Sequence, residues 1–164
     1  MSFYRTANLF SMALVFVATS VGCLPRDVPH RPPLSGHVRD LDGGALGGVT
    51  VRACTTFDGS LSQTCDVATD VTTDGAGRYT VPVHYERVWL ILNATPRIGS
   101  SLIWVCGTDD AVGGAQVLGH DEPRTIDITL GSRGSCTLSP VEGFVPTGEQ
   151  AERICQAIRA RCSG

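Results

Sequence analysis

Short apolar segments separated by turn residues make up most of the chain between residues 34 and 131. Residues 48–53 and 79–83 alternate apolar and polar positions, which is the period of a strand with one buried face. Residues 87–94 and 101–106 are continuous apolar runs of strand length, which indicates strands buried on both faces. The predicted strands cover residues 36–40, 48–53, 65–73, 79–83, 87–94, 101–106 and 124–130. Seven short strands without an intervening helix predict an all-β fold, a seven-stranded antiparallel β-sandwich or small barrel.

Residues 132–164 have a different pattern. Thr147 and Gln150 have the spacing of a capping box, in which the first residue caps the N-terminus of a helix. Apolar residues then recur at helical spacing, at Ala151, Ile154, Cys155, Ile158 and Cys162. The pattern predicts a short amphipathic C-terminal α-helix over residues 148–161.

Glycine is frequent between residues 107 and 119, before the last predicted strand. This composition predicts a loop, because glycine favours turns and weakens strands. Functional residues concentrate on loops that a rigid scaffold holds in place. We therefore expect this stretch to be the best candidate for contact with a partner.

The N-terminus has the order of a secretory signal peptide. Positive charge at Arg5 precedes an apolar stretch over residues 9–18, and small residues follow, so residues 1–22 are the predicted signal peptide. The apolar stretch is too short to span a bilayer as a mature helix. We therefore expect an exported protein.

Cys23 follows directly, and residues 20–23 resemble a bacterial lipobox, whose cysteine receives a diacylglycerol and becomes the mature N-terminus. Ser20 stands where the lipobox prefers a large aliphatic residue, and Ser20 with Gly22 also suits cleavage without lipidation. The resemblance implies a palmitate-bearing lipoprotein of the cell envelope, and Leu24 implies sorting to the outer membrane. A secreted or periplasmic protein is the alternative. Residues 23–33, rich in proline, would be the lipidated cysteine and an extended tether.

Residues 35–83 resemble the carboxypeptidase regulatory-like, or prealbumin-like, family. The matching segments are 36–40 (GHVRD), 48–51 (GVTV) and 73–79 (TDGAGRY), and Gly47 departs from the pattern. The resemblance implies an Ig-like, prealbumin-like sandwich over residues 34–131 that serves as an accessory, binding or spacer module. It leaves residues 132–164 as a disulfide-linked loop and helix.

Six cysteines remain after Cys23, an even number that suits disulfides in an exported chain: Cys54, Cys65, Cys106, Cys136, Cys155 and Cys162. Cys155 and Cys162 lie about 10.5 Å apart along one helix, too far to pair with each other. Cys54 and Cys65 flank a predicted hairpin, so we favour that pair. Cys106 and Cys136 would then each bond one helix cysteine, in an order that the sequence leaves open.

Charge and composition argue against several functions. The net charge is −3 and no basic cluster occurs, so no nucleic-acid partner is expected. All 13 basic residues are arginine, which excludes Schiff-base chemistry on lysine. No P-loop, G-x-S-x-G or H-E-x-x-H motif is present. The sequence therefore predicts neither an enzyme nor a cofactor.

Three groups of residues have both a functional and a structural interpretation. Paired aspartates at 40 and 42, at 70 and 74, and at 109, 110 and 121 suit calcium, but aspartate is also a common turn residue, which we favour. Trp89 and Trp104 could bind a ligand, although both lie in apolar runs that favour core packing. His84 and Tyr85 resemble half of the ligand set of iron-dependent ring-cleaving dioxygenases. Tyr79 and His120 would have to complete it, and we favour a chance adjacency.

Two hypotheses about function follow. The favoured one is a non-enzymatic, lipid-anchored module that binds a protein or glycan partner or has a structural role. The alternative is a secreted or periplasmic metal-dependent hydrolase, with a site built by loops around His84, His120 and Asp121.

Overall fold

The computed structural model describes residues 25–57, 65–89, 99–119 and 122–163. These residues belong to two compact units. The smaller unit includes residues 25–28 and 85–89, and the larger unit includes the rest. Strands β1 (Pro25–Arg31) and β6 (His84–Trp89) pair with each other as a two-stranded sheet.

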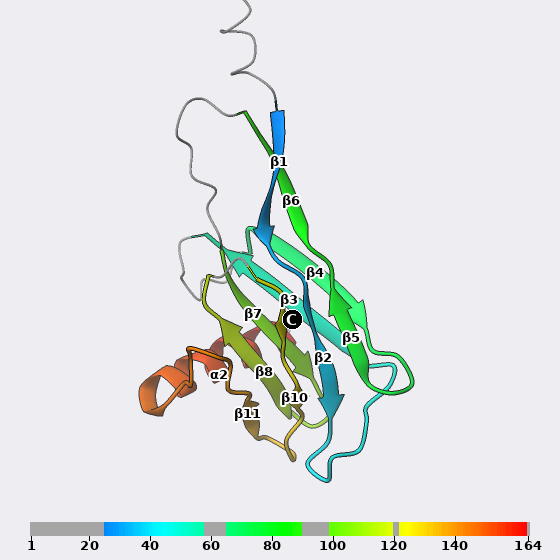
Figure 1. Ribbon diagram of the computed structural model, residues 1–164. Coiled ribbons are helices and arrows are strands. Elements are labelled where there is room, and N and C mark those ends of the chain that lie inside the picture. The colour runs from blue at the N-terminus through cyan, green and yellow to red at the C-terminus, as the bar shows by residue number, and fades with distance from the viewer. Residues whose placement is uncertain (1–24, 58–64, 90–98, 120–121, 164) are drawn as a thin grey trace, which may run out of the picture. The chain divides into compact units, whose positions relative to one another are not determined.

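In its described residues, the larger unit contains two sheets and one helix, besides part of the β1–β6 pair. The first sheet has the order β11 (Cys136–Leu138), β8 (Val112–Val117), β7 (Ser100–Cys106), β3 (Thr50–Thr56) and β4 (Val67–Thr72). The second contains β10 (Ile128–Thr129), β2 (Leu34–Arg39) and β5 (Arg78–Val81), with β9 (Arg124–Thr125) also paired to β2. The helix α2 covers Gly148–Cys162. Figure 1 shows β2, β5 and β10 lying across β3, β7 and β8. The predicted all-β fold with a C-terminal helix is therefore confirmed.

The main core lies between the two sheets. One sheet contributes Val51, Ala53, Ile103 and Val105, and the other contributes Leu34, Val38, Tyr79 and Val81, all of them buried. Alternation placed the inward residues of β3 and β5 correctly, because successive side chains of a strand point to opposite faces. Cys54 lies on the other face of β3, as expected.

The prediction of seven antiparallel strands is wrong: the strand count differs, and the sheets are mixed. The pairs β2–β5, β3–β4, β3–β7 and β7–β8 are antiparallel, but β11–β8, β10–β2 and β9–β2 are parallel. Parallel neighbours need a crossover connection. After β8 the chain passes into the other sheet as β9 and β10 before it returns as β11 beside β8. This detour produces the parallel pairs.

The glycine-rich stretch 107–119 is not a loop throughout, because Val112–Val117 is the buried strand β8. A Cβ atom on Gly113 would lie 2.5 Å from the carbonyl oxygen of Thr129. A Cβ atom on Gly114 would lie 2.6 Å from the carbonyl oxygen of Ile103 and 2.7 Å from Cδ1 of Ile158. Glycine therefore serves close packing here rather than a turn.

Several strands lie at other positions than the sequence predicted. Strand β1 falls within the proline-rich residues 23–33, and β11 falls within residues 132–164. The predicted last strand, 124–130, is divided into β9 and β10. The predicted strand 87–94 begins earlier, as β6, and residues 90–94 lie outside the described part of the chain. The division of the chain into domains stays a prediction.

The helix α2 occupies nearly the predicted range. Its buried residues Ile154 and Ile158 pack against the outer face of the five-stranded sheet. The helix lies beside β8, β11 and β7 (Figure 1). Thr147 is the N-cap residue, but its side chain makes no capping hydrogen bond, so the expected capping box is not formed. None of the helices in the described part of the chain combines the length and the apolar character needed to cross a bilayer.

Candidate functional site

A second apolar cluster lies between the five-stranded sheet and α2. We call it the outer cluster, and its buried members are Cys54, Leu102, Trp104, Val112, Ile154 and Ile158. The partly buried cysteines Cys65, Cys106, Cys136 and Cys162 pack against it. Apolar burial and covalent bonds therefore hold the helix at the same place.

Three disulfides connect the six cysteines after Cys23. Cys54–Cys65 links β3 to a residue two positions before β4, and it is the pair that the sequence favoured. Cys106–Cys162 joins the end of β7 to the last residue of α2, and Cys136–Cys155 joins β11 to the middle of α2. Each helix cysteine is thus bonded to a different strand of the sheet.

Trp104 lies beneath the C-terminal end of α2. Its side chain is buried in the outer cluster, and the guanidinium carbon of Arg161 lies 5.6 Å from the centre of its ring. This is the geometry of a cation–π contact. Burial lowers the pKa of Arg161. Trp104 therefore has a packing role, while the side chain of Trp89 lies outside the described part of the structure.

An open groove with a volume of about 460 Å³ lies beside the Cys106–Cys162 disulfide. It is lined by Cys106, Gly107, Asp110, Ala111, Val112, Gly134, Arg159, Cys162 and Ser163. Nη2 of Arg159 donates a hydrogen bond of 2.9 Å to the carbonyl oxygen of Gly134. Asp109 and Asp110 have φ angles of 56° and 61°, which are uncommon for residues other than glycine. Only the first part of the expected partner-binding loop contributes to this groove.

Two of the candidate calcium-binding aspartates are turn residues. Oδ1 of Asp40 accepts hydrogen bonds from the backbone N–H groups of Asp42 and Gly44, at 3.0 and 2.6 Å. Oδ1 of Asp74 accepts from those of Ala76 and Arg78, both at 2.9 Å. The bond from Arg78 is the main reason that the pKa of Asp74 is lowered. Among the described residues, no three histidine, cysteine, aspartate or glutamate side chains gather as a metal site would require.

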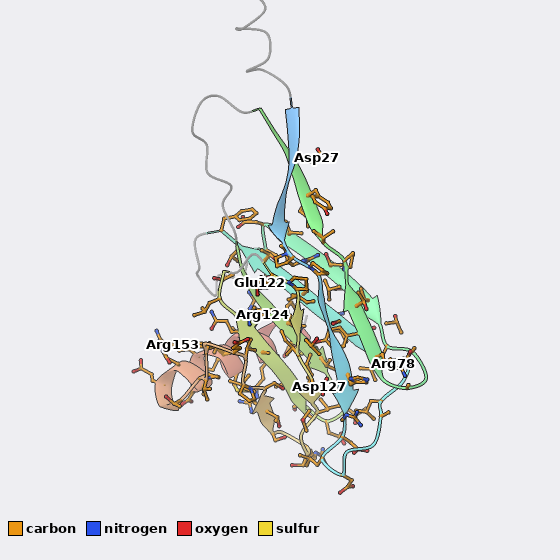
Figure 2. All side chains as sticks on the ribbon, in the orientation of Figure 1. Asp27, Arg78, Glu122, Arg124, Asp127 and Arg153 are labelled. Atoms are coloured by element: carbon orange, nitrogen blue, oxygen red, sulfur yellow. A yellow bond between two sulfur atoms is a disulfide. The ribbon has the colours of Figure 1, made fainter. Side chains whose placement is uncertain are left out.

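Gly36 and Tyr79 both lie against the backbone carbonyl oxygen of Ile126. They are direct partners in the β2–β5 pair. The buried hydroxyl of Tyr79 donates a hydrogen bond of 2.6 Å to the carbonyl oxygen of Ile126, between β9 and β10. A Cβ atom on Gly36 would lie 1.8 Å from that same oxygen, so only glycine leaves room for it. Asp127 follows, and its Oδ1 accepts the backbone N–H of His37 at 2.9 Å (Figure 2).

We expect Tyr79→Phe to lower the free energy of unfolding by about 2 kcal/mol, because the Ile126 carbonyl loses its donor. Burial, and then the charge of Asp127, raise the pKa of Tyr79. The unfolded chain therefore releases this proton first, above a pH of about 10, and stability falls as pH rises past that point. Urea unfolding at several pH values measures both effects. An equal alkaline slope for the wild-type protein and Tyr79→Phe would contradict the second.

Three of the residues considered for a hydrolase or dioxygenase site lie in the described part of the chain. His84 and Tyr85 are exposed at the start of β6, whereas Tyr79 is a core residue whose hydroxyl is already engaged. His120 and Asp121 lie outside the described residues, and so does Cys23. The lipidation and hydrolase hypotheses therefore stay predictions.

Arg31 was not singled out from the sequence, yet it is among the largest fully buried side chains, with 1% of its surface exposed. Its Nη2 donates to Oγ1 of Thr69 and to the carbonyl oxygen of Pro82, both at 3.0 Å. Burial lowers its pKa. Among the described residues, no carboxylate lies within salt-bridge distance of Arg31.

Comparison with known proteins finds weak similarity to solved structures. No protein-family model and no curated protein matches this chain. Among solved structures, catechol 1,2-dioxygenase from Acinetobacter sp. ADP1, inhibited by bound mercury, is 12% identical and matches with a TM-score of 0.35 over 86% of this chain and 73% of its own. Catechol 1,2-dioxygenase from Pseudomonas arvilla C-1 is 10% identical, with a TM-score of 0.33 over 88% and 71%. TM-scores of this size indicate neither a shared fold nor a shared activity.

Proposed function

We propose that this chain is a non-enzymatic module of the bacterial cell envelope, anchored at the outer membrane by a lipid on Cys23. It binds a protein or glycan partner or serves as a structural spacer. The observation that carries the proposal is the pairing of cysteines. Six of the seven cysteines form disulfides, which leaves Cys23 as the odd one. An odd cysteine in an exported protein indicates a role other than an intramolecular disulfide, and Cys23 directly follows the predicted signal peptide.

The use of the polar side chains supports a module without chemistry of its own. The carboxylates of Asp40 and Asp74 organise turns, and the hydroxyl of Tyr79 holds a backbone carbonyl. Each of these groups is a candidate ligand or catalyst by type, and each is already engaged in holding the fold.

The resemblance to the carboxypeptidase regulatory-like family agrees with this use. Of its motif residues, Tyr79 donates a hydrogen bond to the Ile126 carbonyl oxygen, and Gly36 leaves room for that oxygen. A third, Asp74, organises the turn before Tyr79. The motif positions therefore have structural reasons, as expected for an accessory, binding or spacer module.

We expect Cys23→Ala to abolish incorporation of labelled palmitate completely, measured per molecule of protein in a bacterial host. Ser20→Leu is the matched control, because it restores the large aliphatic residue of the lipobox and leaves the cysteine in place. It should retain or increase the label. Full labelling of Cys23→Ala would contradict the anchor. About one equivalent of bound iron, zinc or calcium in the purified protein would contradict the non-enzymatic part.

A further inference from the structure

The Cys106–Cys162 disulfide differs from the other two in its surroundings. Both of its cysteines line the open groove of about 460 Å³. They are half-buried, as Cys65, Cys136 and Cys155 are too, so the groove rather than the exposure sets this pair apart. Cys54 is 1% exposed, and the hollow that it borders has a volume of about 10 Å³, at the lower limit for one water molecule. A reagent as large as a thiol therefore has room beside Cys106–Cys162, whereas the hollow that the described residues form at Cys54 is too small for one.

Position within the fold separates it from Cys136–Cys155 as well. Cys106 is the last residue of β7, and Cys162 is the last residue of α2. Cys136 lies in β11, which pairs with β8, and Cys155 lies in the middle of α2 beside the buried Ile154. The ends of strands and helices open locally more easily than their middles.

We propose that Cys106–Cys162 is the site of thiol–disulfide exchange on this protein, and that the groove takes a thiol carrying both carboxylate and ammonium groups. The charges at the groove fit such a reagent. Arg159, on α2, supplies a guanidinium group, and Asp110, in the loop before β8, supplies a carboxylate. The exchange at this disulfide does not depend on lipidation of Cys23.

The reaction needs two thiols. A reagent thiolate attacks one Sγ of the pair, the S–S bond breaks, a mixed disulfide forms, and the other Sγ leaves as a thiolate. A second reagent thiolate then displaces the protein sulfur from the mixed disulfide. The protein gains two electrons and two protons to give Cys106 and Cys162 thiols, and the two reagent molecules are oxidised to their disulfide.

Glutathione is the probe, because it is a thiol with carboxylate and ammonium groups. The oxidised full chain is incubated with reduced glutathione, quenched with acid, alkylated and analysed by peptide mass spectrometry. Cys106 and Cys162 should become glutathionylated or alkylated at least about ten times faster than the other four cysteines, because exchange depends on access. Earlier reaction of either other pair, or a common rate for all six cysteines, would overturn the proposal.

Two variants of the same helix test the role of the groove charge. Arg159→Gln should slow the reaction of Cys106 and Cys162 with glutathione about threefold, because it removes the positive charge that lines the groove. Arg153→Gln removes the same charge from an exposed position on α2 that does not line the groove (Figure 2), and it should leave the rate unchanged. Equal rates for the two variants would show that Arg159 does not guide the thiol.

Discussion

Replacing both cysteines of the Cys106–Cys162 disulfide with alanine should lower the free energy of unfolding by about 4 kcal/mol. The bond joins residues that are 56 positions apart, the longest separation of the three disulfides. A covalent bond that closes a longer loop removes more conformational freedom from the unfolded chain. Guanidinium-induced unfolding of the double variant, followed by circular dichroism, measures the loss.

The other two disulfides provide the comparison. Cys136–Cys155 spans 19 positions and Cys54–Cys65 spans 11. On the same chain-entropy basis, their removal should cost about 3.2 and 2.8 kcal/mol when each pair is replaced alone. The predicted order is thus set by sequence separation. A larger loss for Cys54–Cys65 than for Cys106–Cys162 would show that native packing, rather than the unfolded chain, determines what these bonds contribute.

Gly36→Ala should lower the free energy of unfolding by about 3 kcal/mol or more. The new Cβ atom would lie 1.8 Å from the carbonyl oxygen of Ile126, which is backbone and cannot turn aside as a side chain would. The segment between β9 and β10 has to move away from β2. That movement also breaks the hydrogen bond from the Tyr79 hydroxyl, so packing and polar contacts are lost together.

Gly75→Ala is the matched control, since no atom lies within 4 Å of the Cβ position at Gly75. We expect its stability to stay within about 0.5 kcal/mol of the wild type. Adding Tyr79→Phe to Gly36→Ala should cost little more than Gly36→Ala alone, because the hydrogen bond is already broken. Fully additive losses in the double variant would refute this coupling.

The pattern of apolar and polar residues predicted burial correctly where alternation within a single strand determines which side chains face the core. The alternation in β3 and β5 placed Val51, Ala53, Tyr79 and Val81 in the core, where they lie. The same reasoning failed for β8, because Gly113 and Gly114 carry no apolar side chain to reveal a buried strand. Glycine is needed at these two positions because Thr129, Ile103 and Ile158 lie too close for a side chain. These three residues belong to other elements of the fold. Composition alone does not contain that information.

The parallel pairs were missed for a related reason. Nothing within residues 124–130 indicates that they lie beside β2, or that Cys136–Leu138 returns to β8. In the candidate site, too, local spacing predicted some features, and others depend on the topology. Hairpin and helix spacing reduced the cysteine pairings to a few, whereas the groove combines residues near 107, 134 and 159, whose proximity depends on the whole topology.

The order of the cysteines also determines what a protease can release from the molecule. The side chain of Arg133 is 82% exposed, in a turn between β10 and β11. A cut after this residue leaves Cys106 on one piece and Cys136, Cys155 and Cys162 on the other. The Cys106–Cys162 bond still joins the two pieces, and Cys136–Cys155 still closes a ring within the second. A single nick at this exposed arginine therefore produces a two-chain molecule rather than a truncated one.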